Sequence, residues 1–299
     1  MGGNVIETKK YTTVMSKILK ERSTGSFMLQ KKVIPKGKEL QMYDRIIGRI
    51  YWDVVDADFP IVVLCEKEDD SWDVWMSDAP FEQESTLPAV EMAKGEVLIC
   101  GLGIGYLPTM IKNKKSVKSI DIVELNKEVI ELVFDQIKTP KMNMIHADAW
   151  KYLAETEKKY DFIHVDIWGS ITAPLREVDK AIKLGKRCLK PNGEIRCWLQ
   201  ELYDRIIDKL PKKPIHFTGL AGIYPPCLIC GKTFRNDYAG LCMDCADALG
   251  VSEVFMNEKK REKQLKTVYI CANCGCRSQQ KRKNCPRCGG TMIPHNVVD

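Results

Sequence analysis

Between residue 96 and about residue 210, short apolar runs alternate with segments in which apolar residues recur every three or four positions. The apolar runs are typical of strands buried on both faces of a sheet, and the other segments are typical of amphipathic helices. The expected strands are EVLICG, VKSIDIVEL, MNMIHAD, YDFIHVDIW and EIRCWLQ, and the expected helices are KEVIELVFDQI, WKYLAETEKK, LREVDKAIKLGKRCL and ELYDRIIDKL. This alternation predicts a doubly wound α/β fold with a mostly parallel sheet.

The first 80 residues follow a different pattern. The runs RIIGRIYWDVV, PIVVLCEK and WDVWMSD are rich in β-branched and aromatic residues and are separated by polar turns, which predicts a small antiparallel β meander. The segment STLPAVEMAKG then predicts a helix with Ser85 or Thr86 as its N-cap and Pro88 in its first turn. We therefore expect an N-terminal meander over residues 1–80 and an α/β domain over residues 81–214.

A third region is expected over residues 215–299, because the composition there changes to cysteine, glycine and basic residues. One charged segment in this region, VSEVFMNEKKREKQLK, predicts a helix. Nine of the thirteen cysteines lie between residues 227 and 288, all of them in the segments PPCLICGKTFRNDYAGLCMDC and ICANCGCRSQQKRKNCPRCGG. Such clustering in a reducing compartment indicates metal binding rather than disulfides.

Each of these two segments contains a pair of CxxC motifs. Paired motifs of this kind present four thiolates in the tetrahedral arrangement that Zn²⁺ prefers, and both segments resemble zinc ribbons. The predicted ligands of two structural zinc sites are Cys227, Cys230, Cys242 and Cys245 in the first and Cys271, Cys274, Cys285 and Cys288 in the second. Cys276 is left over and is an alternative to Cys274 in the second site.

The formal net charge of the chain is +6 at pH 7. Each Zn²⁺ held by four thiolates lowers this charge by two, so two filled sites leave a net charge of roughly +2. The net charge therefore does not identify a partner. Local basic stretches at residues 259–266 and 277–284 predict contact with a nucleic acid or a ribonucleoprotein, with a protein partner as the alternative.

The sequence also indicates in which cellular compartment the protein is expected. The longest apolar runs, such as IVVLC and VLIC, are too short to cross a bilayer, and the N-terminal segment MGGNVIETKK has no apolar signal-peptide core. We therefore expect a cytoplasmic protein that does not associate with membranes.

The glycine-rich segment GEVLICGLGIGYLP at residues 95–108 is the clearest functional feature of the α/β region. Gly101, Gly103 and Gly105 follow its apolar strand at intervals of two. A dinucleotide-binding loop has a longer interval before its third glycine. The tighter spacing favours a cofactor that contains adenosine but no pyrophosphate.

Acidic residues follow the next two expected strands. Glu124 ends the strand SIDIVE, where its carboxylate can accept hydrogen bonds from both ribose hydroxyls. Asp148 follows the third strand, where it can accept a hydrogen bond from the adenine amine while Ala149 and Trp150 flank the ring. The carboxyl ends of parallel strands lie at one edge of a sheet, so these residues and the glycine loop are expected to bind one ligand.

This order of features resembles the class I S-adenosylmethionine-dependent methyltransferases over roughly residues 75–210, and the turn LKPNGEI before the fifth strand is similar to theirs. VLICGLGIG is most similar to the spermidine-synthase-like branch, in which an apolar residue, here Ile99, stands where other methyltransferases carry an acid. WMSDAPFE resembles the segment that closes over the cofactor in that branch. The resemblance implies S-adenosylmethionine contacts at Gly101, Gly103, Gly105, Glu124, Asp148, Asp78 and Glu82.

Two departures from that branch bear on the reaction. Its aminopropyl transferases carry an acid inside the glycine loop and another shortly after the fourth strand, where this sequence has Ile104 and Gly169. The resemblance therefore favours methyl transfer from intact S-adenosylmethionine. Asp166, at the end of the fourth strand, is the expected base or orienting group, and Trp168 is the expected platform for a flat methyl acceptor. His164, two residues earlier on the strand, is expected to be a core residue.

The expected function is thus an S-adenosylmethionine-dependent methyltransferase whose zinc ribbons recruit a macromolecular acceptor, either a nucleic acid or a protein. Two alternatives remain, a non-catalytic adaptor that binds the cofactor and a spermidine-synthase-like aminopropyl transferase. The N-terminal meander resembles dimerising segments of the spermidine-synthase branch, which implies a homodimer.

Overall fold

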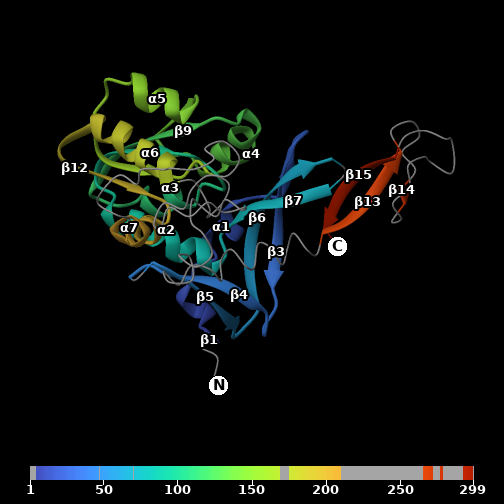
Figure 1. Ribbon diagram of the computed structural model, residues 1–299. Helices are drawn as coiled ribbons and strands as arrows, with labels where there is room; N and C mark the ends of the chain where they lie inside the picture. The colour runs from blue at the N-terminus through green and yellow to red at the C-terminus, as the bar shows by residue number, and fades with distance from the viewer. Residues whose placement is uncertain are drawn as a thin grey trace. The chain divides into compact units, whose positions relative to one another are not determined.

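The computed structural model of the chain describes residues 5–46, 48–69, 71–168, 175–209, 265–271, 277–278 and 292–298. The chain divides into two compact units, residues 1–242 and residues 243–299. Figure 1 shows the described helices and strands, coloured along the chain.

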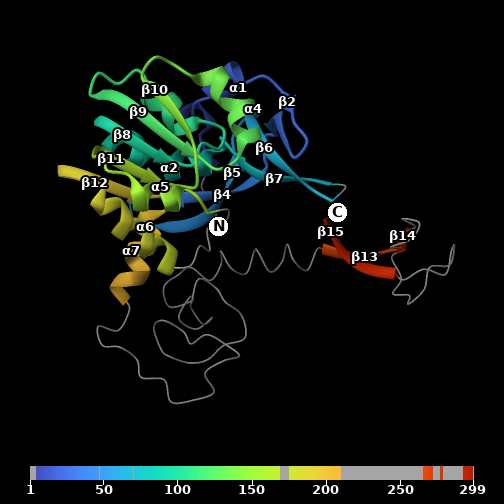
Figure 2. The same cartoon turned by 90° about the horizontal axis from the view of Figure 1, so that it is seen from above.

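A five-stranded parallel sheet forms the centre of the first unit. Its strands are β8 (Gly95–Cys100), β9 (Val117–Glu124), β10 (Met142–His146), β11 (Tyr160–Val165) and β12 (Leu189–Cys197). They lie in the order β10-β9-β8-β11-β12, and every neighbouring pair is parallel, as Figure 2 shows. This strand order, with β8 at the centre, confirms the predicted doubly wound α/β fold.

Helices connect these strands and follow the last one. They are α3 (Tyr106–Ile111), α4 (Lys127–Ile137), α5 (Ala149–Glu155), α6 (Leu175–Arg187) and α7 (Gln200–Lys209). Asn126 caps α4 and Asp148 caps α5, because each side chain accepts hydrogen bonds from two backbone N–H groups of the first turn. Asn126 and Asp148 therefore stand where the loops after β9 and β10 lead into helices, at the carboxyl edge of the sheet.

The helix that precedes β8 begins earlier than predicted. Helix α2 (Pro80–Met92) starts at Pro80, and Pro88 lies inside it rather than in its first turn. Proline at the first helical position has no N–H group to leave unpaired, so Pro80 provides the start that the prediction assigned to Pro88. As a consequence, Glu82 lies on the first turn of a helix and not in a loop.

The N-terminal region consists of two small sheets rather than one meander. Its elements are β1 (Val5–Ile6), the 3₁₀ helix η1 (Thr8–Lys10), α1 (Val14–Ile18), β2 (Arg22–Ser23), β3 (Phe27–Ile34), β4 (Glu39–Asp44), β5 (Arg49–Val55), β6 (Phe59–Glu68) and β7 (Ser71–Ser77). The sheets have the orders β1-β5-β4 and β2-β3-β6-β7, and only the short β1 pairs in parallel. The antiparallel part of the prediction is confirmed for the other pairs.

The N-terminal sheets share a core with the α/β region. Phe27 and Leu29 of β3 belong to the same buried cluster as Val129 and Val133 of α4. Glu128, in the first turn of α4, also accepts hydrogen bonds from the Thr24 hydroxyl at 2.5 Å and the Ser26 N–H at 2.8 Å. These contacts fix β3 and its neighbours against α4, and Met76 of β7 lies against Gly103 of the glycine loop.

The described part of the second unit is a three-stranded antiparallel sheet. Its strands are β13 (Leu265–Cys271), β14 (Arg277–Ser278) and β15 (Met292–Val298), in the order β14-β13-β15. The prediction of a helix over 251–266 is wrong for its last two residues, because Leu265 and Lys266 begin β13. Residues 251–264 lie outside the described ranges. Strand pairing with β15 holds this end extended.

Of the predicted zinc ligands, only Cys271 is described, at the end of β13. The other seven, Cys227, Cys230, Cys242, Cys245, Cys274, Cys285 and Cys288, lie outside the described residues. Within the described ranges, no cluster of three or more His, Cys, Asp or Glu side chains is arranged to hold a metal ion. No helix in these ranges combines the length and apolar character needed to span a bilayer.

Candidate functional site

The glycine loop begins where β8 ends, between β9 and β11. The Gly101 N–H donates to the Val123 carbonyl of β9 at 2.8 Å, and the Asp166 N–H donates to the Cys100 carbonyl at 2.9 Å. Gly101 has φ +98°, and a Cβ on it would lie 2.0 Å from the Asp166 carbonyl oxygen. No side chain fits there, so glycine is required by both the backbone conformation and the close approach of β11.

Gly103 is the point where the N-terminal region meets this loop. It has φ +51°, and a Cβ on it would lie 2.2 Å from the sulfur of Met76, which belongs to β7. Gly105, the third glycine, has φ +74° and is the N-cap of α3. The loop is therefore held from one side by the sheet and from the other by β7.

A cavity of about 390 Å³ opens at this edge of the sheet. The predicted site residues that line it are Glu82, Gly101, Gly103, Glu124, Asp148, Ala149, Asp166 and Trp168. The structure thus brings together residues from α2, the glycine loop and the ends of β9, β10 and β11. Gly105 and Asp78 do not line the cavity.

Asp78 lies behind the cavity, in the protein interior. Its side chain is fully buried, and Oδ1 accepts a hydrogen bond from the Val62 N–H at 2.7 Å. Burial raises the pKa of Asp78 to about 6, and Oδ2 has no hydrogen-bond partner among the described residues. The contact that the resemblance implied for Asp78 is therefore not available in this arrangement, in which Asp78 ties β6 to the start of α2.

The carboxylate of Glu124 holds two loops at once. Oε2 accepts a hydrogen bond from the Leu102 N–H of the glycine loop, and Oε1 accepts one from the Asn126 N–H, both at 2.8 Å. Each oxygen retains a lone pair that can face the cavity. Asp148 also has two roles. It caps α5 by accepting a hydrogen bond from the Trp150 N–H at 2.7 Å, and it lines the cavity.

Two further acidic residues line the cavity, Glu82 in the first turn of α2 and Asp166 directly after β11. Burial raises the pKa of Asp166 to about 7. Burial, and then the charge of Asp166, raises the pKa of Glu82 to about 8. A bound cation would favour the ionised form of both carboxyl groups. The indole N–H of Trp168 is buried nearby and has no hydrogen-bond partner in the described structure.

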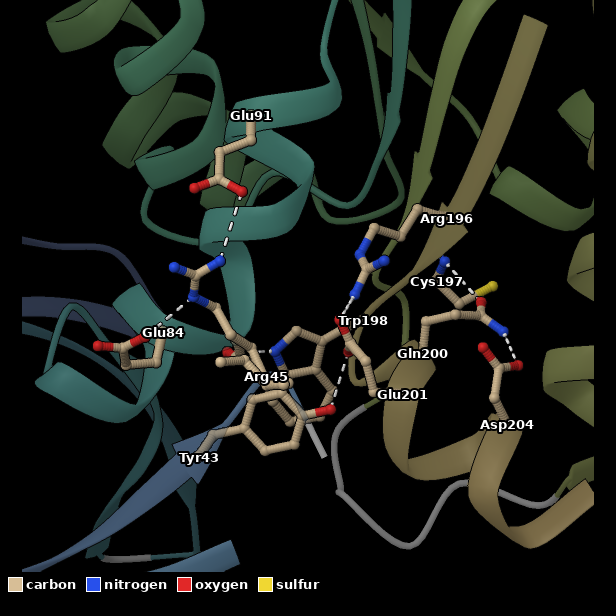
Figure 3. Close-up of polar contacts among 12 residues, drawn as sticks. Tyr43, Arg45, Glu84, Glu91, Arg196, Cys197, Trp198, Gln200, Glu201 and Asp204 are labelled. Carbon is tan, nitrogen blue, oxygen red and sulfur yellow. Dashed lines mark hydrogen bonds and ion pairs between the residues drawn. The ribbon is translucent and has the colours of Figure 1, made fainter. Parts of the chain in front are cut away.

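Trp198 completes this side of the cavity and is held by a polar network shown in Figure 3. Its indole N–H donates to the Ser85 hydroxyl of α2 at 2.9 Å. On the neighbouring residues, Glu201 pairs with Arg196 and accepts a hydrogen bond from the Tyr43 hydroxyl at 2.9 Å. The network joins β4, α2, β12 and α7 and so fixes the wall that carries Glu82.

The lining of the cavity has one sign of charge. Its acidic side chains are Glu82, Glu124, Asp148 and Asp166, and none of the described lining residues is a lysine or an arginine. The nearby ammonium of Lys180 lies 4.4 Å from the ring centroid of Trp150 and does not line the cavity. The site therefore favours a cationic ligand over an anionic one.

Several lining residues were not predicted as site residues. Trp75 and Met76 belong to the segment WMSDAPFE, so the signal for them was present, but the acids of that segment were chosen instead. His164 lines the cavity although it is buried on a strand, as expected of a core residue. For Trp198, the sequence offers no signal beyond its place at the end of the fifth strand.

Two comparisons with known sequences find similarity to proteins of polyamine synthesis. Residues 85–202, less than half of the chain, match the family model of the spermine/spermidine synthase domain. A polyamine aminopropyltransferase from Methanocaldococcus jannaschii is 43% identical over 77 residues, which are 23% of this chain and 26% of that protein. The chain thus matches about a quarter of the length of this relative.

Solved structures show partial similarity. A spermidine synthase in complex with the transition state analogue AdoDATO has a TM-score of 0.36 and 16% identity, covering 61% of this chain and 74% of its own. Spermidine synthase from Thermotoga maritima has a TM-score of 0.35 and 16% identity, with coverages of 53% and 62%. An S-adenosylmethionine-dependent methyltransferase from Thiobacillus denitrificans, in complex with S-adenosyl-L-homocysteine, has a TM-score of 0.32 and 22% identity, with coverages of 39% and 47%.

These findings correct the expectation of an S-adenosylmethionine-dependent methyltransferase. The matched family model is that of the spermine/spermidine synthase domain, and the curated relative is a polyamine aminopropyltransferase; neither is a methyltransferase. The expectation depended on the missing acids at Ile104, which is fully buried, and at Gly169, which lies outside the described residues. The sequence argument overlooked that Glu82 of α2 joins Asp166 in the cavity and supplies an acid from a different element.

Proposed function

We propose that the chain transfers an aminopropyl group from decarboxylated S-adenosylmethionine to an amine. The observation that carries this proposal is the charge of the cavity, which has four acidic side chains and no described lysine or arginine in its lining. Decarboxylated S-adenosylmethionine has a sulfonium and an ammonium but no carboxylate. Intact S-adenosylmethionine has a carboxylate, for which the described lining offers no basic side chain. The match to the spermine/spermidine synthase domain supports the same choice.

The nucleoside part of this donor fits the part of the cavity lined by the glycine loop, Glu124 and Asp148. Gly101 and Gly103 line the cavity, Glu124 offers lone pairs to the ribose hydroxyls, and Asp148 lies at the end of the next strand for the adenine amine. Trp150 and Ala149 follow Asp148 and line the same wall. These assignments retain the predicted contacts of Gly101, Gly103, Glu124, Asp148 and Ala149, and they change the group that is transferred.

The amine fits between Glu82 and Asp166. Both carboxyl groups have raised pKa values, so a bound ammonium replaces the protons that the empty site retains near neutral pH. In the reaction, the amine nitrogen forms a bond to the sulfonium-bound methylene carbon, the carbon–sulfur bond breaks, and its electron pair goes to sulfur. The proton leaves the nitrogen for the Asp166 carboxylate, which has a pKa near the working pH.

Product analysis tests this function. Full-length protein is incubated with decarboxylated S-adenosylmethionine and a series of amines, namely 1,3-diaminopropane, 1,4-diaminobutane, spermidine and spermine. We expect methylthioadenosine and an amine extended by one aminopropyl group, with at least a hundredfold lower rate for Asp166→Asn. Absence of methylthioadenosine with every amine, from protein that binds the donor, would refute the proposal.

We also propose that the two cysteine sets each hold one structural Zn²⁺. The paired CxxC spacing supports this, as does the scarcity of apolar residues over 225–290, because such a segment needs a metal to fold. Mass spectrometry of metal content is expected to find two zinc equivalents per chain. A content below two equivalents in protein purified without chelator would contradict the assignment. Contact between this region and nucleic acid or a protein stays a prediction, as does a homodimer.

A further inference from the structure

Trp198 is the residue at which the elements that carry the two acids Glu82 and Asp166 meet. It directly follows β12, is 7% exposed and lines the cavity. Its backbone N–H donates to the carbonyl of Val165 at 2.9 Å, and Val165 ends β11 directly before Asp166. Its indole N–H donates to the Ser85 hydroxyl of α2 at 2.9 Å. One residue therefore holds the end of β11 through its backbone and α2 through its side chain.

Ser85 connects the indole of Trp198 to Glu82. Ser85 is 1% exposed and lies three residues after Glu82 on α2, so the two residues are neighbours on one side of the helix. Its hydroxyl donates to the Glu82 backbone carbonyl at 3.1 Å. Burial, and then the charge of Asp166, raises the pKa of Glu82 to about 8, and hydrogen bonding with the side chains of Trp198 and Ser85 acts in the opposite direction. Both side chains therefore favour the ionised form of this carboxyl.

The indole ring of Trp198 is itself fixed by aromatic packing. Phe81 meets it edge-on, with the ring centroids 6.3 Å apart and the planes at 66°. The ring of Tyr43, on β4, lies 6.0 Å from that of Phe81. Such pairs of buried rings add to the energy of apolar burial and prefer a defined geometry. The position of the indole N–H is thus set by protein packing before any ligand binds.

Other titratable or charged groups also surround the two acids. They are Asp78 before α2, His164 on β11, Glu177 on α6, Arg196 and Cys197 on β12, and Glu201 and Tyr203 on α7. Burial lowers the pKa of His164 to about 3, and it raises the pKa of Asp78 to about 6 and that of Cys197 to about 12. Burial also raises the pKa of Tyr203, while Arg196 and Glu201 pair with each other. Between pH 7 and pH 9, proton release from Glu82 and Asp166 therefore dominates the charge of this part of the cavity.

We propose that Trp198 is a positioning residue for the amine: its indole N–H, acting through Ser85, holds Glu82 where it and Asp166 reach one ammonium group together. This inference rests on the proposed aminopropyl transfer. The backbone of Trp198 pairs with the strand that ends at Asp166, so both acids are placed relative to the same residue. The attraction between a carboxylate and an ammonium weakens with distance, so a displaced Glu82 binds the amine less tightly. Trp198 acts on the amine through Glu82 and is not itself a catalytic residue.

Substitutions on both sides of the hydrogen bond between Trp198 and Ser85 test this role. Trp198→Phe keeps an aromatic ring but removes the N–H, and Ser85→Ala removes the hydroxyl. If the two side chains act through one bond, the double variant loses no more affinity than the single variants, because each single change already breaks that bond. Tyr11→Phe is the matched control. The Tyr11 hydroxyl donates to Glu84 of α2 at 3.0 Å, and neither residue lines the cavity.

Calorimetry with the full-length protein gives the first readout. The dissociation constants of 1,4-diaminobutane and spermidine are measured at pH 8.5 in the presence of methylthioadenosine, and that of methylthioadenosine is measured alone. We expect each single variant to bind the amines about 3- to 10-fold more weakly, the effect of losing one hydrogen bond, and the double variant to lie within about twofold of the weaker single variant. Binding of methylthioadenosine should stay within about twofold in every variant, and Tyr11→Phe should change neither constant. Thermal unfolding measures any loss of stability separately.

The pH dependence of amine binding gives a second readout that a loss of stability alone would not change. Amine affinity is expected to rise with pH as Glu82 and Asp166 ionise. Loss of the indole N–H removes a group that lowers the pKa of Glu82, so in Trp198→Phe this rise should move to higher pH. The substitution introduces no titratable group. The measurement is the dissociation constant of 1,4-diaminobutane from pH 7 to pH 9 in the wild type, Trp198→Phe and Tyr11→Phe.

The inference is overturned if Trp198→Phe binds the amines as the wild type does, if the losses of the two single variants multiply in the double variant, or if Tyr11→Phe weakens amine binding equally. A parallel fall in methylthioadenosine binding, or an unchanged pH dependence in Trp198→Phe, also overturns it. The proposed function fails separately if the wild type binds amine and donor but forms no product; the binding constants then still decide the role of Trp198. If the wild type binds neither amine, both statements are wrong.

Discussion

The carboxylate of Glu124 accepts a 2.8 Å hydrogen bond from the backbone N–H of Leu102, which lies 22 positions earlier in the chain. Its second oxygen accepts another from the Asn126 N–H. The acid at the end of β9 therefore shapes the glycine loop after β8 before any ligand is present. A residue chosen from the sequence as a ribose contact is also a structural part of the site.

The first prediction concerns this double role. Glu124→Gln retains one acceptor oxygen and places an NH₂ group against the other backbone N–H. We expect a loss of stability of about 1–3 kcal/mol and at least tenfold weaker binding of methylthioadenosine, measured by denaturant unfolding and calorimetry. Glu131→Gln, at an exposed ion pair with Lys127 on α4, is the control and should change neither quantity. Unchanged nucleoside binding by Glu124→Gln would remove Glu124 from the ligand site.

The second prediction concerns the glycine loop. Gly103→Ala adds a methyl group 2.2 Å from the Met76 sulfur at a backbone φ of +51°. We expect a loss of roughly 1–3 kcal/mol of stability and at least tenfold weaker nucleoside binding, because Met76 or the loop must move. Gly37→Ala is the control, since Gly37 has φ +81° but no atom within 4 Å of the added Cβ. It should lose about 1 kcal/mol of stability and bind the nucleoside normally.

The third prediction is a stability change that depends on pH. Burial raises the pKa of Asp166 from 3.8 to about 7 in the folded protein, so the folded state holds a proton that the unfolded state releases at lower pH. Stability contributed by this group is therefore present below pH 3.8 and is lost as the pH rises toward 7. Asp166→Asn should be more stable than the wild type at pH 8, on the order of 1–4 kcal/mol, and equal to it near pH 4. An equal or lower stability of the variant at pH 8 would contradict the burial of this carboxyl.

The fourth prediction concerns the affinity of the amine. Glu82 and Asp166 bind an ammonium in their ionised forms, and their pKa values in the empty site are about 8 and about 7. The dissociation constant of 1,4-diaminobutane should therefore fall by about tenfold or more between pH 6.5 and pH 8.5. Glu82→Gln should bind more weakly at pH 8.5 and show a smaller change with pH. Affinity that is independent of pH would exclude this carboxyl pair as the amine site.

The fifth prediction separates scaffold from site in the network of Figure 3. Tyr43→Phe removes the hydroxyl that donates to Glu201 at 2.9 Å, and Tyr43 is 1% exposed. Stability should fall by about 1–2 kcal/mol while nucleoside binding stays within twofold, because Tyr43 does not line the cavity. Tyr203→Phe is the control, since the Tyr203 hydroxyl has no hydrogen-bond partner among the described residues, and its removal should not lower stability.

The sequence predicted the parallel sheet well because its strands are continuous apolar runs that only a doubly covered sheet can bury. It also predicted that Glu124 and Asp148 lie together, since both follow strands whose carboxyl ends share one edge, and both line the cavity; their contacts with a ligand stay a prediction. It failed for Asp78 because an acid after a strand can turn into the interior or into a cavity, and only the packing of β6 decides between them. Glu82 was assigned to the cofactor from the resemblance of WMSDAPFE, and its place on the first turn of α2 was missed because the sequence did not show that this helix starts at Pro80. His164 was interpreted as a core residue, and no local pattern shows which nitrogen lacks a partner.

The central claim is that an acidic cavity selects a donor without a carboxylate. Its most direct test is the ratio of the dissociation constants of intact and decarboxylated S-adenosylmethionine, measured by calorimetry at one pH with the full-length protein. The account predicts that the decarboxylated compound binds at least tenfold more tightly. Equal affinity, or tighter binding of the intact compound, would contradict it.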